Sequence, residues 1–295
     1  MTHRAGTGLA LALAGLAAAA TPAAAEEALL AEACGGCHAA GAAGLSRIEG
    51  QRKTPEGWLM TIVRMRIAHG MEIDAADQAR LVAYLAETQG LAPSETAGMR
   101  YALEKDPDVI EGFDEPYASM CARCHTGARG VLQARSPEEW TLLMDFHVGQ
   151  FPTIEYQALG RDREWYRIAR DEIAPMLAEA HPLDAEAWTA WQAAEKVSPA
   201  GDWVVLTSLP GRGQAYGRLT VAGEGSPYAV SGALRLADGT EAPVSGRMNL
   251  YTGYEWRADL DVGGTPMRQV LALSEDGTGL EGRQFQRDAD SLGAR

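Results

Sequence analysis

Cysteine is scarce in this chain of 295 residues, and what the sequence lacks excludes several classes of protein. Four cysteines are too few for the disulfide framework that supports small secreted domains. After residue 25, no apolar run approaches the length that a transmembrane helix needs. Basic residues are outnumbered, since 26 basic against 40 acidic side chains give a formal charge of −14. The sequence therefore predicts neither a membrane protein nor a nucleic-acid-binding protein, because phosphate binding needs a basic face.

All four cysteines fall in two copies of the pattern Cys-x-x-Cys-His, at residues 34–38 and 121–125. This pattern is the attachment signature of c-type haem: two thiols form thioether bonds to the haem vinyl groups, and the histidine binds the iron. A zinc ribbon would not need the histidine, and a thioredoxin-like motif would occur once, near a βαβ pattern. We therefore predict two covalently bound haems c. The predicted attachment residues are Cys34, Cys37, Cys121 and Cys124, and the predicted proximal ligands are His38 and His125.

Residues 1–25 have the features of a secretory signal peptide. Arg4 precedes an apolar run from Leu9 to Ala20, and residues 23–25 form a small-residue cleavage site. We therefore expect a periplasmic protein whose mature chain begins at Glu26. Export agrees with the haem prediction, because c-type haem is attached outside the bacterial cytoplasm.

The remainder of the chain divides into two parts with different residue patterns. Residues 26–198 are rich in Ala, Leu, Glu and Arg, which predicts an all-α dihaem cytochrome c-like domain. Residues 199–295 predict an antiparallel β-barrel or sandwich, because short alternating runs are separated by glycine-containing turns. One such run places Tyr228, Val230, Gly232, Leu234 and Leu236 on one face of a strand. The expected fold class is therefore multidomain, with an all-α domain followed by an all-β domain.

The helical part contains an internal repeat. Residues 54–58 (TPEGW) recur as residues 136–140 (SPEEW), and each copy reads as a helix start with a capping Thr or Ser and a proline at the first helical position. The haem motifs are 87 residues apart and the tryptophans 82. This predicts two tandem cytochrome c-like units, at about 26–92 and 93–198.

The repeat also indicates sixth ligands for the two irons. Met65 follows Trp58 by seven residues, and His147 follows Trp140 by seven, which is two helical turns. We therefore predict His38/Met65 ligation at haem 1 and His125/His147 at haem 2. The two potentials should then differ, because methionine raises the potential relative to histidine.

Two alternatives stay open at haem 1, namely His69 and Met71. Met71 precedes the predicted helix from Asp74 to Leu85, which is where many single-haem cytochromes c carry their methionine. In the second unit the other histidine is His181, which we expect to be a surface or capping residue.

Two stretches of the chain resemble the α subunit of quinohaemoprotein amine dehydrogenase, residues 52–58 (RKTPEGW) and 146–159 (FHVGQFPTIEYQAL). The order of signal, dihaem domain and β domain is similar too. The resemblance implies a periplasmic αβγ heterotrimer that oxidises primary amines to aldehydes and ammonia. It implies a cysteine tryptophylquinone in the small γ subunit, a propeller as the β subunit, and one bis-His and one His/Met haem in the α subunit.

The resemblance further implies that this chain takes electrons from the quinone and passes them to a cupredoxin or a soluble cytochrome c. No Ser/His/Asp arrangement or phosphate loop stands out, so no catalytic residue is predicted here. Members of the family continue into further immunoglobulin-like domains beyond the first β domain, so we expect a C-terminally short copy. The alternatives are a free-standing dihaem cytochrome c shuttle and a dihaem peroxidase-like enzyme.

Overall fold

The structure is a computed structural model that describes residues 22–156 and 163–287. Residues 1–21 of the predicted signal peptide lie outside the described residues, and residues 22–25 form the start of helix α1 (Pro22–Cys34). Within the described part of the chain, no helix is both long enough and apolar enough to cross a membrane.

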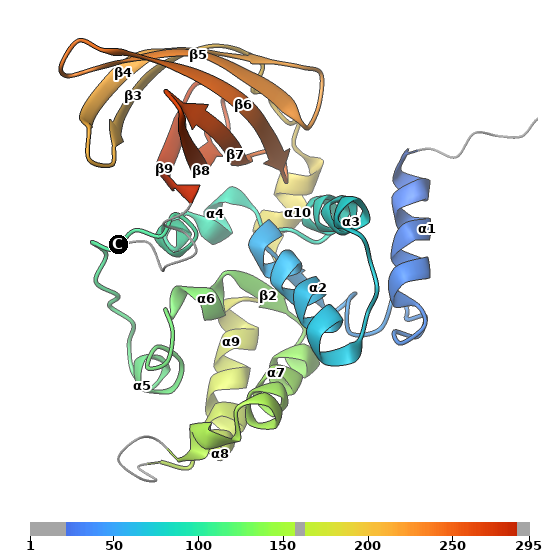
Figure 1. The fold of residues 1–295 in the computed structure, drawn as a ribbon. Helices are drawn as coiled ribbons and strands as arrows, with labels where there is room; N and C mark the ends of the chain where they lie inside the picture. The colour runs from blue at the N-terminus through green and yellow to red at the C-terminus, as the bar shows by residue number, and fades with distance from the viewer. Residues whose placement is uncertain (1–21, 157–162, 288–295) are drawn as a thin grey trace, which may run out of the picture.

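Residues 22–156 and 163–193 form a helix-rich part, shown below the barrel in Figure 1. Its longer helices are α1, α2 (Pro55–His69), α3 (Ala75–Thr88), α7 (Pro137–Gln150), α9 (Ala174–Ala180) and α10 (Glu186–Ala193). Its short helices are α4 (Pro93–Thr96), α5 (Tyr117–Cys121), α6 (Ala128–Val131) and α8 (Trp165–Ile168). Arg100–Ala102 and Pro152–Glu155 form 3₁₀ turns, and Ala169–Ile173 forms a π-helical turn.

The prediction of an all-α first domain is wrong. Strand β1 (Gln51–Lys53) pairs antiparallel with β2 (Gln133–Arg135), so the helix-rich part is mixed. Each strand is followed by the N-cap residue of a helix whose first residue is proline. The cap residue has an extended backbone, because a residue before proline avoids helical backbone angles. The backbone groups of these extended residues need partners, and each copy of the repeat supplies them to the other. Strands of three residues are too short to show a period in the sequence.

The β1–β2 pairing relates the two copies of the repeat by a local two-fold symmetry. Arg52 and Ala134 are equivalent positions in the repeat, and they pair with each other. The flanking pairs, Gln51 with Arg135 and Lys53 with Gln133, are symmetric about this central pair. The helices that follow therefore leave the small sheet as equivalent elements, α2 in one copy and α7 in the other.

Arg52 fixes the small sheet to its surroundings. Its guanidinium binds both carboxylate oxygens of Glu95, at 2.9 and 2.8 Å, and also donates to the carbonyl of Leu183 at 2.7 Å. The side chain is 3% exposed and lies over the ring of Trp188. A planar, bidentate contact of this kind holds α4 and the segment before α10 in one arrangement.

Residues 201–286 form the antiparallel sheet that the alternating pattern predicts. Its seven strands pair in sequence order, which is a meander. They are β3 (Gly201–Leu209), β4 (Gly213–Ala222), β5 (Tyr228–Leu236), β6 (Glu241–Tyr251), β7 (Glu255–Val262), β8 (Thr265–Leu273) and β9 (Leu280–Gln286). In β5 the expected face is buried at Tyr228, Val230, Leu234 and Leu236.

The sheet curls into a nearly closed barrel, seen from the side in Figure 1. Gly232 and Gly282 have φ values of 152° and 148°, and a Cβ at either would lie within 2.3 Å of a carbonyl oxygen on the neighbouring strand, so glycine permits the sharp bend. The side chain of Gln284 on β9 reaches Thr207 on β3 and brings the two edges together.

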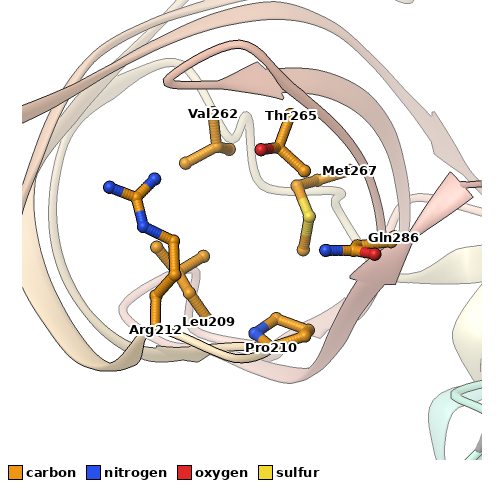
Figure 2. A pocket seen from close by; sticks show the side chains of 7 residues that line it. All are labelled: Leu209, Pro210, Arg212, Val262, Thr265, Met267 and Gln286. Carbon is orange, nitrogen blue, oxygen red and sulfur yellow. The ribbon is translucent and has the colours of Figure 1, made fainter.

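Side chains fill the barrel. Figure 2 shows the small space left at one end, a cavity of about 20 Å³ beside Leu209, Arg212 and Met267. That volume holds about one water molecule. The barrel core consists of apolar residues such as Met248 and Trp256, so this part of the chain is packed like an ordinary protein core.

The barrel docks on the helix-rich part through the turn between β6 and β7. Thr252 Oγ1 donates to the carbonyl of Ala86 at 3.1 Å, and Tyr254 Oη lies 2.9 Å from Thr96 Oγ1. Trp191 on α10 donates to the carbonyl of Thr252 at 2.9 Å and packs edge-on against Tyr254. The turn is therefore buried between the barrel and helices α3, α4 and α10.

Candidate functional site

The first Cys-x-x-Cys-His motif forms a tight turn at the end of α1. Cys34 is the last residue of that helix, and its carbonyl accepts from the N–H groups of Cys37 at 3.1 Å and His38 at 2.9 Å. The turn brings the two thiols and the imidazole of the motif into one local unit. His38 Nδ1 lies 2.8 Å from the carbonyl of Ser46, which orients the ring.

The second motif begins in the same way, because Cys121 is the last residue of α5. The preceding residue, Met120, is held through its carbonyl by the indole N–H of Trp165 at 2.9 Å. His125 Nδ1 lies 2.8 Å from the carbonyl of Thr126. The carboxylate of Glu111 accepts from the hydroxyl of Thr126 and, at 2.7 Å, from the N–H of Gly127, and so fixes the chain after the motif.

The three predicted histidine ligands share one hydrogen-bonding pattern. His38 and His125 each place Nδ1 on a backbone carbonyl, and His147 places Nδ1 2.7 Å from the carbonyl of Leu143. A carbonyl only accepts, so Nδ1 must carry the proton and Nε2 keeps its lone pair for a metal. Burial also lowers the pKa of His147, which favours the neutral ring that a metal requires. The chemistry of these three histidines therefore fits haem iron.

Burial keeps two of the four thiols, Cys34 and Cys121, in the neutral thiol form. Burial raises the pKa of Cys121 to about 12, and burial together with Cys37 raises the pKa of Cys34. A zinc site needs thiolates, which burial disfavours at these two positions. Within residues 22–156 and 163–287, no group of three or more His, Cys, Asp or Glu side chains could hold a metal ion by itself.

His147 lies in an aromatic setting on α7. Its ring centroid is 5.7 Å from that of Trp165 and 5.9 Å from that of Phe146. Burial and the hydrogen bond to the Leu143 carbonyl have the largest effects on the pKa of His147. The charges of His125 and Arg64 have smaller effects, and both lower this pKa. The structure thus brings His125 and His147 within electrostatic range of each other. The segment 157–159 of the second resemblance motif lies outside the described residues.

The candidates for the sixth ligand of haem 1 lie near the end of α2. Met65 is on the helix and half-buried, while His69 is exposed. Gly70 has φ 69° and turns the chain, and the N–H of Met71 donates to the carbonyl of Met65 at 3.2 Å. Met71 and Cys34 are partly buried and pack against the core cluster that contains Trp58, and Met65 is not among the described residues that do so. All three residues thus stay candidates.

Two models of known protein families match this chain, one over the helix-rich part and one over the barrel. The family model described as quinohemoprotein amine dehydrogenase A, alpha subunit, haem binding, matches residues 24–188, and the model of alpha subunit domain II matches residues 196–295. The chain belongs to the quinohaemoprotein amine dehydrogenase α-subunit family. No curated protein matches the sequence. The resemblance seen in the sequence is therefore confirmed, and so is haem binding as a property of the helix-rich part of this α subunit.

Several residues that support the haem motifs of this α subunit were not predicted as site residues. Trp165 holds the backbone before Cys121 and contacts the His147 ring, while Glu155 fixes α8 by accepting from the N–H groups of Trp165 and Tyr166 at 3.0 and 2.8 Å. Glu111 caps the segment after His125. A tryptophan in the sequence suggests a buried position, so Trp165 could have been found there, but an isolated glutamate does not indicate a role near the haem motif. His181 is the C-cap residue of α9.

Proposed function

We propose that this chain is the dihaem electron-transfer subunit of a periplasmic amine dehydrogenase. It accepts electrons from a tryptophylquinone in a small γ subunit, in a complex that also holds a propeller β subunit. It passes them to an external cupredoxin or cytochrome c. The observation that carries the proposal is the shared hydrogen-bonding pattern of His38, His125 and His147, in a chain whose family binds haem: each uses Nδ1 on a carbonyl, and no hydrogen bond from its Nε2 is seen among the described residues.

The residues of this chain hold and orient two haems c, which supply reversible one-electron transfer at iron. Cys34 and Cys37 bind one haem and Cys121 and Cys124 the other, each pair at the end of a helix. Hydrogen bonds to backbone carbonyls fix the imidazoles of the axial histidines, so little reorganisation accompanies a change of iron charge. At the second haem, the buried core that includes Tyr117, Trp140 and Trp165 excludes water, and Trp140 is 0% exposed.

The proposed axial ligands make the two haems unequal. His147 at haem 2 is an imidazole ligand, whereas haem 1 takes a thioether sulfur from Met65 or Met71. A thioether raises the potential relative to imidazole, so haem 1 is the better electron acceptor. Two haems of unlike potential give electron flow a direction within one chain.

The stoichiometry of the reaction suits a chain with two haems. Oxidation of a primary amine with water gives an aldehyde, ammonia, two protons and two electrons. Each haem takes one electron, so one turnover at the quinone fills both. Substrate oxidation itself belongs to the partner subunit that carries the quinone.

The test is haem reduction by amine in the assembled complex. The chain is expressed with the genes for the other subunits and purified by a tag on this chain. It is then mixed anaerobically with a primary amine in a stopped-flow spectrometer. We expect both haems to become reduced, and a tertiary amine of similar size should leave them oxidised. If the chain purifies alone with two haems that a primary amine does not reduce, the free-standing cytochrome is the correct function.

A further inference from the structure

Basic side chains crowd at the seam between the two copies of the repeat, where β1 pairs with β2. We call the group formed by Arg47, Lys53, Arg64, Arg135 and Glu139 the seam cluster. The positive charges of the three arginines lower the pKa of Lys53, and the negative charge of Glu139 raises it. Four cations therefore face one carboxylate, in a chain whose total formal charge is −14.

The single carboxylate of the cluster is already engaged by two of the cations. Glu139 pairs with Arg47 at 2.5 Å and with Arg135 at 3.5 Å, and its side chain is nearly buried. Lys53 donates to Thr61 Oγ1 at 2.8 Å, and Arg64 lies over a phenyl ring. Within the described residues, neither Lys53 nor Arg64 forms a salt bridge.

Lys53 is the cation whose setting is least compatible with an unpaired charge. It is 5% exposed, and its Nζ lies 4.8 Å from the ring centroid of Trp58. Burial, together with the charges of Arg135 and Arg64, lowers the pKa of Lys53 well below its ordinary value. A buried cation among other cations is unfavourable unless an anion compensates it. The seam cluster therefore has the character of an anion site.

The covalent chemistry of haem c indicates which anion fits. A haem c is tethered by its vinyl edge, so its two propionate carboxylates point away from the Cys-x-x-Cys-His motif. The cluster touches the two helices that carry the candidate sixth ligands. Lys53 donates to Thr61 on α2, which carries Met65, and Arg64 lies 4.5 Å from the ring centroid of Phe146, the neighbour of His147 on α7.

We propose that a haem propionate occupies the seam cluster and forms an ion pair with Lys53 and Arg64. This inference rests on the proposed function, because it requires haem c in this chain. The ion pair keeps Lys53 charged and cancels the negative charge of the carboxylate near the iron. It thereby raises the potential of that haem and ties the haem to both copies of the repeat.

The test uses Lys53→Met in the full haem-loaded chain, because methionine has nearly the shape of lysine without its charge. Loss of a cation near iron stabilises the ferric form, so the ratio of reduced to oxidised haem at a fixed solution potential should fall by about tenfold at one haem. That potential should also become pH-dependent and rise as the pH falls, because the unpaired propionate takes up a proton. Lys53→Arg should behave like the wild type.

The matched control is Lys196→Met. Lys196 also lies over a tryptophan, with Nζ 4.4 Å from the ring centroid of Trp191, but it follows α10 beside the barrel. It should leave both haem potentials unchanged. If Lys53→Met likewise leaves both unchanged in a protein that carries two haems, the seam cluster holds no propionate, and the proposed function stands. A chain that carries no haem contradicts both.

Infrared spectroscopy identifies the occupant directly. Haem labelled with ¹³C in its propionate carboxyl groups gives redox difference bands that belong to those carboxylates. We expect Lys53→Met to shift one labelled band, and Lys196→Met to shift none. If the labelled bands do not move and the wild-type potential instead changes on adding inorganic phosphate, the cluster binds a soluble anion and the inference is wrong.

Discussion

At the scale of single residues, the hydrogen bond of one ring nitrogen decides which nitrogen of a histidine can bind iron. His38, His125 and His147 all use Nδ1 on a carbonyl oxygen of their own neighbourhood, which leaves Nε2 for iron. His181, by contrast, ends α9, and its carbonyl accepts from the indole of Trp140 at 3.3 Å. The same residue type thus has a ligand geometry in three places and a capping role in one.

The His147 assignment predicts a selective change at one haem. His147→Ala should remove the sixth ligand of haem 2, so about half of the haem absorbance should change from low spin to high spin. Visible and electron paramagnetic resonance spectra of the oxidised protein measure this. His181→Ala is the control and should keep both haems low spin. A wild-type spectrum in His147→Ala would contradict the assignment.

Met65 and Met71 can be separated by the spectrum of the ferric protein. The residue that binds iron gives a near-infrared sulfur-to-iron band, which its replacement by alanine should abolish while lowering the potential of haem 1. We expect Met65→Ala to have this effect. Met71→Ala should instead lower the stability by about 1–2 kcal/mol through lost packing, since Met71 is partly buried and packs against the core cluster that contains Trp58. The opposite result would assign Met71 as the ligand.

At the scale of elements, the helices that carry the candidate sixth ligands start in equivalent ways. Thr54 and Ser136 are extended, and each hydroxyl accepts from a backbone N–H at 3.2 Å, those of Gly57 and Glu139. Proline follows each cap. The start of α2 fixes the position of Met65 about three turns later, and the start of α7 fixes His147 at the same offset.

Removal of one cap should therefore destabilise the protein by a known amount. Ser136→Ala should lower the free energy of unfolding by about 1 kcal/mol, measured by denaturant unfolding of the haem-loaded protein. Thr141→Ala removes a hydroxyl from the same helix, where it donates to the carbonyl of Pro137 and caps nothing, so it should cost less than half as much. Equal losses would show that the Ser136 hydroxyl does not act as a cap.

The sequence predicted those elements whose signal is local. The barrel strands, the turns at Asp238-Gly239 and Gly263-Gly264, and the helix starts could all be read from neighbouring residues. The β1–β2 sheet could not, because each strand is three residues long and its partner is 82 positions away in the repeat. The contacts of Trp165 and Glu111 with the second motif are tertiary, so they leave no period or spacing to detect.

At the scale of the whole molecule, a buried ionic group joins the barrel to the helix that carries Met65. Arg257 on β7 forms an ion pair with Glu56 in the first turn of α2 at 2.5 Å, and its guanidinium donates to Glu255 at 3.3 Å. Burial works to raise the pKa of Glu56, but the Arg257 guanidinium outweighs it and lowers that pKa. For Glu255 burial prevails over Arg257 and raises the pKa to about 8. Glu255 is therefore largely protonated at neutral pH.

This group predicts how stability depends on pH. The pKa of Glu255 is raised on folding, so its contribution is fully present below the ordinary value of 4.5 and is lost as the pH rises towards 8. In the wild type, the free energy of unfolding should fall by about 1.4 kcal/mol per pH unit in that window. Glu255→Gln mimics the protonated form, so this fall should be absent from the variant. Glu241→Gln, on an exposed residue of β6, is the control. Parallel curves for the wild type and Glu255→Gln between pH 5 and 8 would disprove this account.

The proposed function requires that one exported chain carries two haems of unequal potential. An anaerobic redox titration of the purified chain, followed by visible spectra with the haem content counted independently, tests it most directly. The account predicts two covalently bound haems per chain and two separate one-electron transitions, the higher belonging to the methionine-ligated haem. A single transition, two identical transitions, or a chain without covalent haem would contradict it.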